Sequence, residues 1–376
     1  MRLSAGQLNR TTLQRQLLLE RQPWPVLDAV RHLVALQAQH AASPYLALWN
    51  RVGGFDPADL DTAFDEHRIV KASLLRITLH AVAAEDHPVL HAVMQPTLRA
   101  SRLADRRFTR TGLTSADADA SLPEVLTFLR EARTNAEMQA MAAERFGDTA
   151  ETGLWWALRT FAPLIHAPTG PPWTFGQRPA YRVAPTSPYP SERADAMVEL
   201  ARRYLRAYGP ATPADLAQFS TLYRPPAKEA FTALADELVH HTGPDGKPLV
   251  DLADGVIAEE DTPAPPRLLG MWDNALLAHV DRGRLVPADH KPVVIRRNGD
   301  MLPTVLVDGV VAGVWRAIDQ GIEVTAFRRL PTAVWDELAE EAGSLAGMLA
   351  ARDPLVYRRY GHWWESLPAT QVRTLR

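Results

Sequence analysis

Two glutamines, Gln37 and Gln39, stand one residue apart in the run LVALQAQH, shortly before Ser43 and Pro44. A glutamine amide has no useful acid or base strength, but its carbonyl dipole can hold a water molecule or face a developing positive charge. Inside a helix, residues two apart point in nearly opposite directions and cannot share a site. Because proline disfavours helical backbone in the residue before it, we predict a helix over 25–40 that ends close to Gln39. At such an end the two amides either converge on one cavity or cap the last carbonyls of the helix.

Other familiar chemistry is missing from the sequence. The 376 residues contain no cysteine, which excludes disulfides, thiolate nucleophiles and cysteine-based zinc or iron–sulfur sites. There is no phosphate-binding glycine loop, no serine-hydrolase elbow and no zinc-protease motif. His87 and His91 are four residues apart on a predicted helix, but no third ligand is evident nearby. We therefore expect no metal and no cofactor.

The charge is acidic overall but uneven along the chain. The net charge is -3, which argues against a uniformly basic nucleic-acid binder. Arg99, Arg102 and Arg106 share a helical face, and Arg107 and Arg110 follow them. Since attraction to phosphates is local at physiological salt, an acidic protein can still bind DNA where one face collects its arginines.

Nothing in the sequence suggests a membrane segment. Apolar residues make up 46% and charged residues 23%, which is typical of a soluble globular protein. The first twenty residues lack the apolar core of a signal peptide, and no later run is long enough to span a bilayer. We expect a cytoplasmic protein.

The elements that position the glutamines repeat one order, three helices followed by a hairpin, which is the order of a winged helix. In the middle of the chain, capping signals at Ser121–Glu124 and Thr134–Glu137 predict two helices, a third covers Gly153–Phe161, and PLIHAPTGPPWTF forms a hairpin. A second copy has helices over 192–208, from Thr212, and over 226–239, and the run HHTGPDGKPLVDLADG forms its hairpin. A looser copy at the N-terminus has helices over 4–20, 25–40 and 57–67. The sequence predicts three tandem winged-helix motifs.

The C-terminal third is rich in strands. Asn298-Gly299 and Asp308-Gly309 are strong hairpin signals, and an amphipathic helix covers about 332–351. We predict an α+β, mainly α, fold that ends in a C-terminal β-barrel with a bracing helix. The predicted units are residues 1–110, which carry the two glutamines, 111–188, 189–262 and 263–376.

Five runs of the sequence together resemble the winged-helix DNA glycosylases of the AlkZ/YcaQ type. They are LVALQAQHAASPYLALWNR, LLRITLH, YGPATPADLAQFS, LLGMWDNALLAHVDRGR and LVDGVVAGVWR, and they follow the expected order over nearly the whole chain. The resemblance implies a C-shaped arrangement of winged helices and barrel around a DNA channel. It implies excision of N7-alkylated purines, including interstrand crosslinks, with Gln37 and Gln39 as the catalytic residues. The alanine between them is a mild departure from the motif, and the second glutamine matches the AlkZ branch.

The chemistry of such a substrate suits two amides. Alkylation at N7 makes the purine cationic, so it leaves as a neutral base and needs no general acid. The amides then have to position a water and face an oxocarbenium-like sugar.

The expected partner is double-stranded DNA that contains N7-alkylguanine lesions or crosslinks, bound by a monomer in DNA repair or in self-resistance to an alkylating natural product. In the hairpin over 295–303, two arginines suit phosphates and Met301 suits an apolar wedge in the minor groove. The residues predicted to bind DNA are Arg51, Arg76, His80, Arg282, Arg284, Arg296, Arg297 and Met301.

Two other functions fit the same elements. A winged-helix transcriptional regulator with a ligand-binding barrel would bind one operator and release no base. A non-catalytic lesion-binding protein would prefer damaged DNA and also release none.

Overall fold

The computed structural model describes the backbone of residues 1–376 and the side chains of all of them except 148–152. The first helices are α1 (Ala5–Arg15), α2 (Val26–His32), α3 (Ser43–Trp49), α4 (Pro57–Asp65), α5 (His87–Leu103), α6 (Arg106–Thr109), α7 (Ser115–Phe128), α8 (Asn135–Phe146) and α9 (Asp148–Phe161). The later helices are α10 (Arg193–Tyr208), α11 (Pro213–Ser220), α12 (Arg224–Ala233), α13 (Lys291–Val294) and α14 (Thr332–Ala350). In the part of the chain that is described, no helix has the length and apolar character needed to cross a membrane.

Local capping signals located two of the three helix starts for which they were used. The capping boxes at Thr134–Glu137 and Thr212–Asp215 open α8 and α11 as predicted. The prediction of a helix start at Ser121 is wrong, because a capping box at Thr114–Asp117 opens α7 six residues earlier. Ser121 lies inside that helix and donates its hydroxyl hydrogen to the carbonyl of Ala118.

The helix predicted over 25–40 is also wrong. α2 ends at His32, and Val34 adopts a left-handed backbone with φ 68° that no helix can continue through. Pro44, expected to stop that helix, instead lies in the first turn of the separate helix α3, where its missing N–H costs nothing. Gln37 is therefore on a strand.

Six strands form one antiparallel sheet in the order β1-β3-β2-β5-β6-β4. They are β1 (Leu36–Gln37), β2 (Ile69–Ser73), β3 (Leu79–Ala83), β4 (Arg133–Thr134), β5 (Leu164–Ala167) and β6 (Ala180–Val183). β6 replaces the return strand expected around Trp173–Phe175. Lys71 on β2 is paired with His166 on β5, so this sheet crosses the predicted boundary at residue 110.

The remaining strands form a small hairpin and an open sheet. The hairpin is β7 (Leu238–Thr242) with β8 (Pro248–Leu252), as predicted. The second sheet has the order β13-β12-β11-β10-β9, with β9 (Arg267–Leu269), β10 (Thr304–Val307), β11 (Val310–Ile318), β12 (Gly321–Ala326) and β13 (Gln371–Leu375). The strands and the bracing helix are present as predicted, but they form an open sheet and no closed barrel, because the two end strands, β13 and β9, do not pair with each other. β9 is only three residues long, and α14 packs against β9, β12 and β13.

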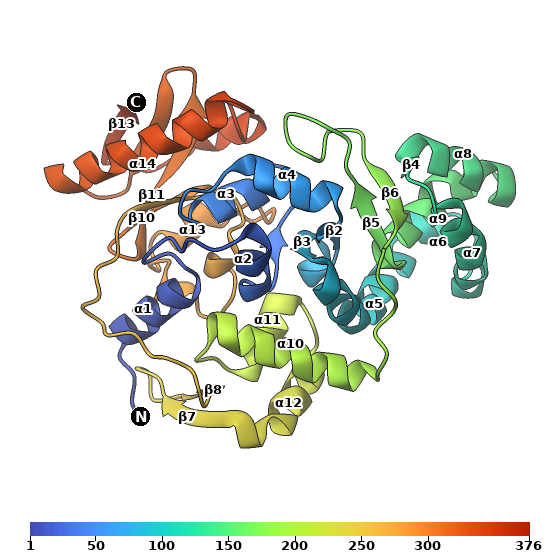
Figure 1. Cartoon of the computed structure of the whole chain (residues 1–376), viewed down its shortest axis with the longest axis horizontal. Helices are drawn as coiled ribbons and strands as arrows, with labels where there is room; N and C mark the ends of the chain where they lie inside the picture. The colour runs from blue at the N-terminus through green and yellow to red at the C-terminus, as the bar shows by residue number, and fades with distance from the viewer.

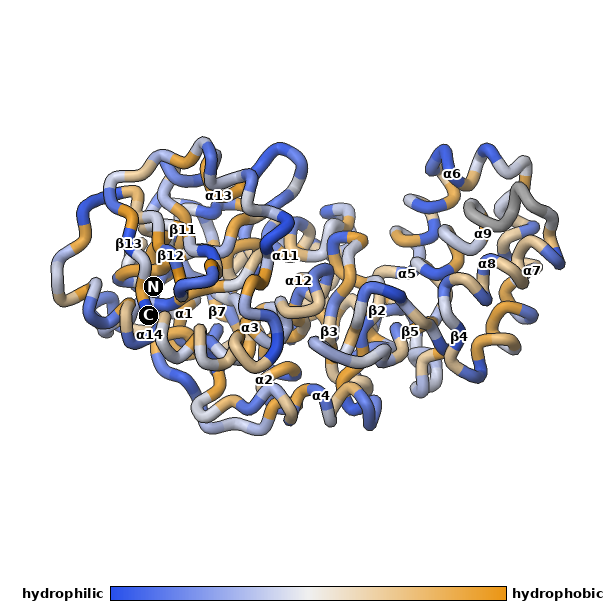
Figure 2. The backbone as a smooth tube through the Cα atoms, turned by 90° about the horizontal axis from the view of Figure 1, so that it is seen from above, coloured by the Kyte–Doolittle hydropathy of each residue, from blue (hydrophilic) through white to orange (hydrophobic). Residues whose placement is uncertain are grey.

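The N-terminal helices occupy the middle of the molecule (Figure 1). α2, α3 and α4 lie between the C-terminal sheet with α14 on one side and α5 to α9 on the other, as the view from above also shows (Figure 2). Tyr45 of α3 belongs to the same buried cluster as Trp315 of the C-terminal sheet and Trp335 of α14. The segment that carries the two glutamines therefore shares a core with the far end of the chain.

Buried ion pairs join segments that are distant in sequence. Arg51, at the end of α3, is 1% exposed and donates two hydrogen bonds of 2.8 and 2.7 Å to Asp273. Arg15 of α1 pairs with Asp251 of β8 at 2.6 Å. Breaking such a pair leaves a buried charge without a partner, which is strongly destabilising.

We expect Arg51→Met to lower the free energy of unfolding by about 3–5 kcal/mol, because Asp273 then stays buried and unpaired. The double variant Arg51→Met/Asp273→Asn should recover most of this loss, since asparagine is neutral and can still accept from the N–H of Ala275. Urea unfolding of the wild type and the two variants measures both values. A double variant no more stable than Arg51→Met would show that the pair does not account for the loss.

Several buried histidines predict a loss of stability in acid. Burial lowers the pKa of His87 and of His279 to about 3, and lowers that of His40 to about 4. Below about pH 6.5 these histidines bind protons in the unfolded chain but stay neutral in the folded chain. The free energy of unfolding therefore falls as the pH is lowered from about 6.5 towards 3. Each such histidine should lower the free energy of unfolding at pH 5.5 by roughly 1 kcal/mol relative to pH 7.5. Urea unfolding at pH 7.5 and 5.5 tests this, and His87→Leu should show a smaller difference between the two pH values. Equal differences for His87→Leu and the wild type would contradict it.

Candidate active site

Gln37 and Gln39 lie on an edge strand and the turn that follows it. Gln37 is paired with His80 of β3, and the N–H of Ala38 donates to the carbonyl of Leu79 at 2.8 Å. After Ala38 the chain leaves the sheet, and the N–H of Gln39 turns back to the side-chain oxygen of Gln37 at 2.8 Å. The first glutamine thus fixes the backbone of the second.

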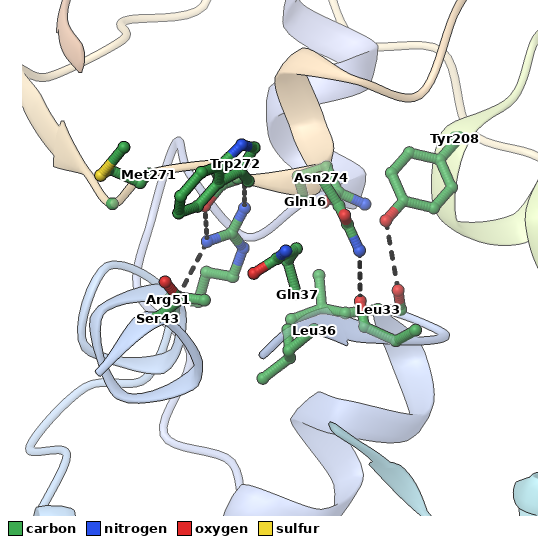
Figure 3. A pocket seen from close by; sticks show the side chains of 14 residues that line it. Gln16, Leu33, Leu36, Gln37, Ser43, Arg51, Tyr208, Met271, Trp272 and Asn274 are labelled. Atoms are coloured by element: carbon green, nitrogen blue, oxygen red, sulfur yellow. Dashed lines mark hydrogen bonds and ion pairs between the residues drawn. The ribbon is translucent and has the colours of Figure 1, made fainter. Parts of the chain in front are cut away.

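The Gln37 side chain points into a small polar cavity (Figure 3). The residue is only 6% exposed, and its amide lies between Arg51 and Asn274. The cavity has a volume of about 10 Å³, enough for about one water molecule. Two buried polar atoms of its lining residues, Gln16 Oε1 and Arg51 Nε, have no hydrogen-bond partner in the described part of the protein. Gln37 thus lines a space of about the size of one water molecule, next to residues with unpaired polar atoms.

Gln39 faces a different and larger space. It is exposed, and its Oε1 accepts a long hydrogen bond of 3.4 Å from the N–H of Leu79. It lines a cleft of about 370 Å³ with Lys71, Trp156 and other residues of β2, α9 and β5. Gln37 is joined to Gln39 through its hydrogen bond from the Gln39 N–H, but the two amides do not converge on one cavity, which was one of the two arrangements expected for them.

The histidines next to the glutamines are neutral at physiological pH. Burial, helped by Arg359 and Lys71, lowers the pKa of His40 to about 4. Burial and the nearby Arg76 guanidinium hold the pKa of His80 well below its usual value. Neither imidazole can serve as a protonated general acid near pH 7.

The segment Asp273–Asn274 holds β1 in place from the opposite side. The side-chain amide of Asn274 donates to the carbonyl of Ala35 at 2.6 Å, immediately before β1. Its oxygen accepts from Arg76 Nη2 at 2.6 Å. Asp273 receives the two hydrogen bonds from Arg51 described above.

Three of the residues predicted to bind DNA brace the interior instead. Arg51 is buried against Asp273, and His80 is 0% exposed. Arg76 is half-buried and donates to Asn274 and to the carbonyl of Phe219, at 2.6 and 2.8 Å. The predicted contacts of Arg51 and His80 with DNA do not fit this structure, because Arg51 is already paired with Asp273 and neither side chain lines the cleft that Gln39 faces.

The other predicted DNA contacts divide by exposure. Arg282 and Arg284 are half-buried and donate to the carbonyls of Leu276 and Pro210. In the predicted hairpin, Arg297 is exposed, and Arg296 lies over the ring of Trp363 at 4.7 Å. Met301 is 1% exposed and packs in a core with Leu276 and Leu285, so the wedge proposed for it does not fit.

Two residues beside the glutamines were not among the predicted site residues. Gln16 is 1% exposed and forms part of the cavity that Gln37 enters. Lys71 is 6% exposed and lines the cleft that Gln39 faces. The sequence signal for Lys71 is the charged residue in the apolar strand IVKAS, whereas Gln16 carries no signal of its own.

Comparisons with known proteins agree on one family. A family model described as DNA glycosylase AlkZ-like matches residues 30–348. The chain is 28% identical over 372 residues to an interstrand DNA cross-link repair glycosylase of Streptomyces sahachiroi, and the match covers 93% of this chain and 98% of that protein. The solved structure of S. sahachiroi DNA glycosylase AlkZ superposes with a TM-score of 0.79 at 25% identity, covering 93% of this chain and 97% of that one.

The family match includes the segment with Gln37 and Gln39, all six strands of the first sheet, and β9 to β12 of the second. The family description, the relative and the solved structure name the same kind of enzyme. The chain belongs to the AlkZ-like DNA glycosylase family.

Proposed function

We propose that the protein hydrolyses the N-glycosidic bond of N7-alkylated purines in DNA, including bulky adducts and interstrand crosslinks. This activity would serve DNA repair and self-resistance to an alkylating natural product. The observation that carries the proposal is the segment Gln37–Gln39, which presents one amide to a water-sized polar cavity and one to an open cleft. It does so in a chain of the AlkZ-like family.

The substrate supplies the activation that the site lacks. An N7-alkylguanine is cationic and leaves as a neutral base, so the bond breaks without a proton donor. The neutral histidines next to the glutamines fit this mechanism, because neither imidazole carries a proton to give near pH 7. The barrier that remains is the positive charge on the sugar and its capture by water.

We assign the two amides different tasks. Gln37 is buried and its side-chain oxygen accepts from the Gln39 N–H, so it holds the second glutamine in its orientation. Gln39 is exposed in the cleft, so its amide positions the attacking water and its carbonyl dipole faces the sugar as positive charge develops. A glutamine cannot take a proton from the water, and the water is therefore positioned rather than deprotonated.

The protein acts in this proposal as a monomer on double-stranded DNA. The repeated order of three helices and a hairpin supports three tandem winged-helix motifs arranged as a C around the duplex. The exposed Arg297 and the half-buried Arg282, Arg284 and Arg296 remain candidates for phosphate contacts. Binding of this kind would place the protein with the nucleoid.

The regulator alternative loses one of its two elements. It combined repeated winged helices with a ligand-binding barrel, and the five-stranded sheet is open. Membership of a glycosylase family also favours base release over lesion binding alone.

Replacement of either glutamine by alanine should slow base release by roughly ten- to a thousand-fold, the range for loss of one preorganised polar group. The melting temperature should be unchanged for Gln39→Ala, because this side chain is exposed. DNA that contains N7-methylguanine is incubated with each variant, and free base and alkali-labile abasic sites are quantified. Gln320→Ala, an exposed glutamine in the β11–β12 turn, is the matched control. Full activity of the Gln37→Ala/Gln39→Ala double variant would rule out the mechanism.

The second prediction concerns the range of substrates. Uracil is a neutral base and leaves as an anion, so its release needs a proton donor or strong contacts to the departing base. We expect release of N7-alkylguanines from methyl adducts to crosslinks, and no detectable release of uracil under the same conditions. The assay compares matched duplexes that differ only in the lesion. Efficient excision of uracil, or refusal of the small methyl adduct, would mean that a base-reading pocket sets the specificity instead.

A further inference from the structure

The cleft that Gln39 faces carries positive charge without a carboxylate to balance it. Three cations line it: Lys71, Arg102 and Arg159. No aspartate or glutamate stands among the described residues of its wall. We call this group of three side chains and the space between them the cationic cleft.

Lys71 is the most unusual member of the cationic cleft. It lies on β2, in the middle of a six-stranded sheet, and is 6% exposed. Its Nζ lies 4.7 Å from the centre of the Phe175 ring, and no described carboxylate forms an ion pair with it. Burial alone lowers its pKa, to about 8, so the amine is still mostly charged at pH 7. A buried ammonium without an anion costs stability, and such a cost persists where a function requires the charge.

The two arginines are held by neutral groups. Arg159 donates to the side-chain oxygen of Asn135 at 3.0 Å and to the Tyr181 hydroxyl at 3.4 Å. Arg102 donates to the hydroxyl of Thr160 at 3.2 Å, and its guanidinium lies 4.7 Å from the centre of the Trp156 ring. Most of the buried arginines elsewhere in this protein, such as Arg15 and Arg51, pair with a carboxylate. The guanidinium groups of the cleft are thus oriented by neutral partners, and neither forms an ion pair with a described carboxylate.

The cleft adjoins the place of the reaction. Gln39 forms part of its wall, and Leu79, whose N–H bonds Gln39, is paired with Ser73 on the strand that carries Lys71. Three cations without an ion-pair partner among the described residues would, beside Gln39, oppose the positive charge that grows on the sugar during bond cleavage. They would also repel a cationic N7-alkylguanine. An anion bound in the cleft removes both problems.

We propose that the cationic cleft binds a phosphodiester group of the DNA next to the lesion, with Lys71 as its buried contact and Arg102 and Arg159 beside it. This inference rests on the proposed function and deepens it. The bound phosphate fixes the lesion-bearing sugar against Gln39 and restores local neutrality. Lys71 is a positioning residue in this reaction, since it acts through the phosphate and not on the reacting bond.

The first test measures binding of undamaged duplex DNA, which does not depend on glycosylase activity. Lys71→Met should reduce the slope of log binding constant against log salt concentration by about 1, and should weaken binding about five-fold at 0.15 M salt. Lys71→Arg should restore most of the slope. Lys247→Met is the matched control, because Lys247 lies in the exposed β7–β8 turn and already pairs with Asp245. A slope for Lys71→Met equal to that of the wild type would overturn the proposal.

The second test locates the phosphate. Single phosphates around an N7-methylguanine are replaced, one at a time, by uncharged methylphosphonates. The wild type should lose affinity at one or two positions near the lesion, and Lys71→Met should be insensitive at those same positions. Equal sensitivity of the two proteins at every position would show that Lys71 does not contact a phosphate of the DNA.

Two further readouts separate other roles of Lys71. Removal of an uncompensated buried charge should leave the melting temperature of the free protein unchanged or raise it. A lower melting temperature together with an unchanged salt slope would make the residue structural and overturn the proposal. Covalent trapping of Lys71 on abasic DNA by borohydride would assign the amine to the sugar aldehyde instead. Inorganic phosphate could bind to the wild type at low millimolar concentration, but not to Lys71→Met, and leave DNA binding unchanged. This result would mean that the site takes a small free anion, and it would overturn the proposal.

Discussion

The position of the candidate active site depends on the hydrogen bonds of two adjacent side chains, Asp273 and Asn274. They fix the end of α3 through Arg51, the turn at Arg76, and the carbonyl of Ala35 before β1. Because all these groups are removed from water, each must find its partner inside the protein, and few other arrangements satisfy them all. The edge strand that carries Gln37 is only two residues long. Its own backbone hydrogen bonds would not hold it, so the Asp273–Asn274 segment supplies the rigidity that a preorganised site needs.

The backbone next to this segment is strained, and the strain lies close to the glutamines. Val34, three residues before Gln37, has φ 68°, and the consecutive residues Arg76 and Ile77 have φ 54° and 58°. A β-branched residue in the left-handed region costs about 1–3 kcal/mol and persists only where the surroundings impose it. The anchors are visible here: Arg76 is held at both Phe219 and Asn274. Release of the turn at Arg76 and Ile77 would move Leu79, whose backbone contacts both Ala38 and Gln39.

Arginines in this protein differ in how their charge is balanced. The buried Arg51 and Arg15 pair with Asp273 and Asp251, whereas the half-buried Arg76 and Arg284 are held by neutral groups. Beside Gln39 the cations form no ion pair with a described carboxylate, and the nearby His40 stays neutral because it is buried and close to other cations. A net charge of -3 therefore says little about the surface that DNA would meet. What matters for a phosphate is the balance within about a Debye length, roughly 8–10 Å.

The sequence by itself determined the features that depend on neighbouring residues. The capping box at Thr134–Glu137 opens α8, the Asp308-Gly309 turn joins β10 to β11, and the motif with Gln37 and Gln39 indicates the family. Only the tertiary structure decided the roles of residues whose partners are far away. Arg51 and Arg76 resemble DNA contacts in the sequence, but they meet Asp273 and Asn274, which are 222 and 198 residues away along the chain. Met301 was predicted to be an exposed wedge, but it packs in a core with residues from other segments. Lys71 becomes buried only when β2 pairs with β5. Local rules act through backbone neighbours, whereas burial and charge pairing depend on which distant surfaces meet in the folded chain.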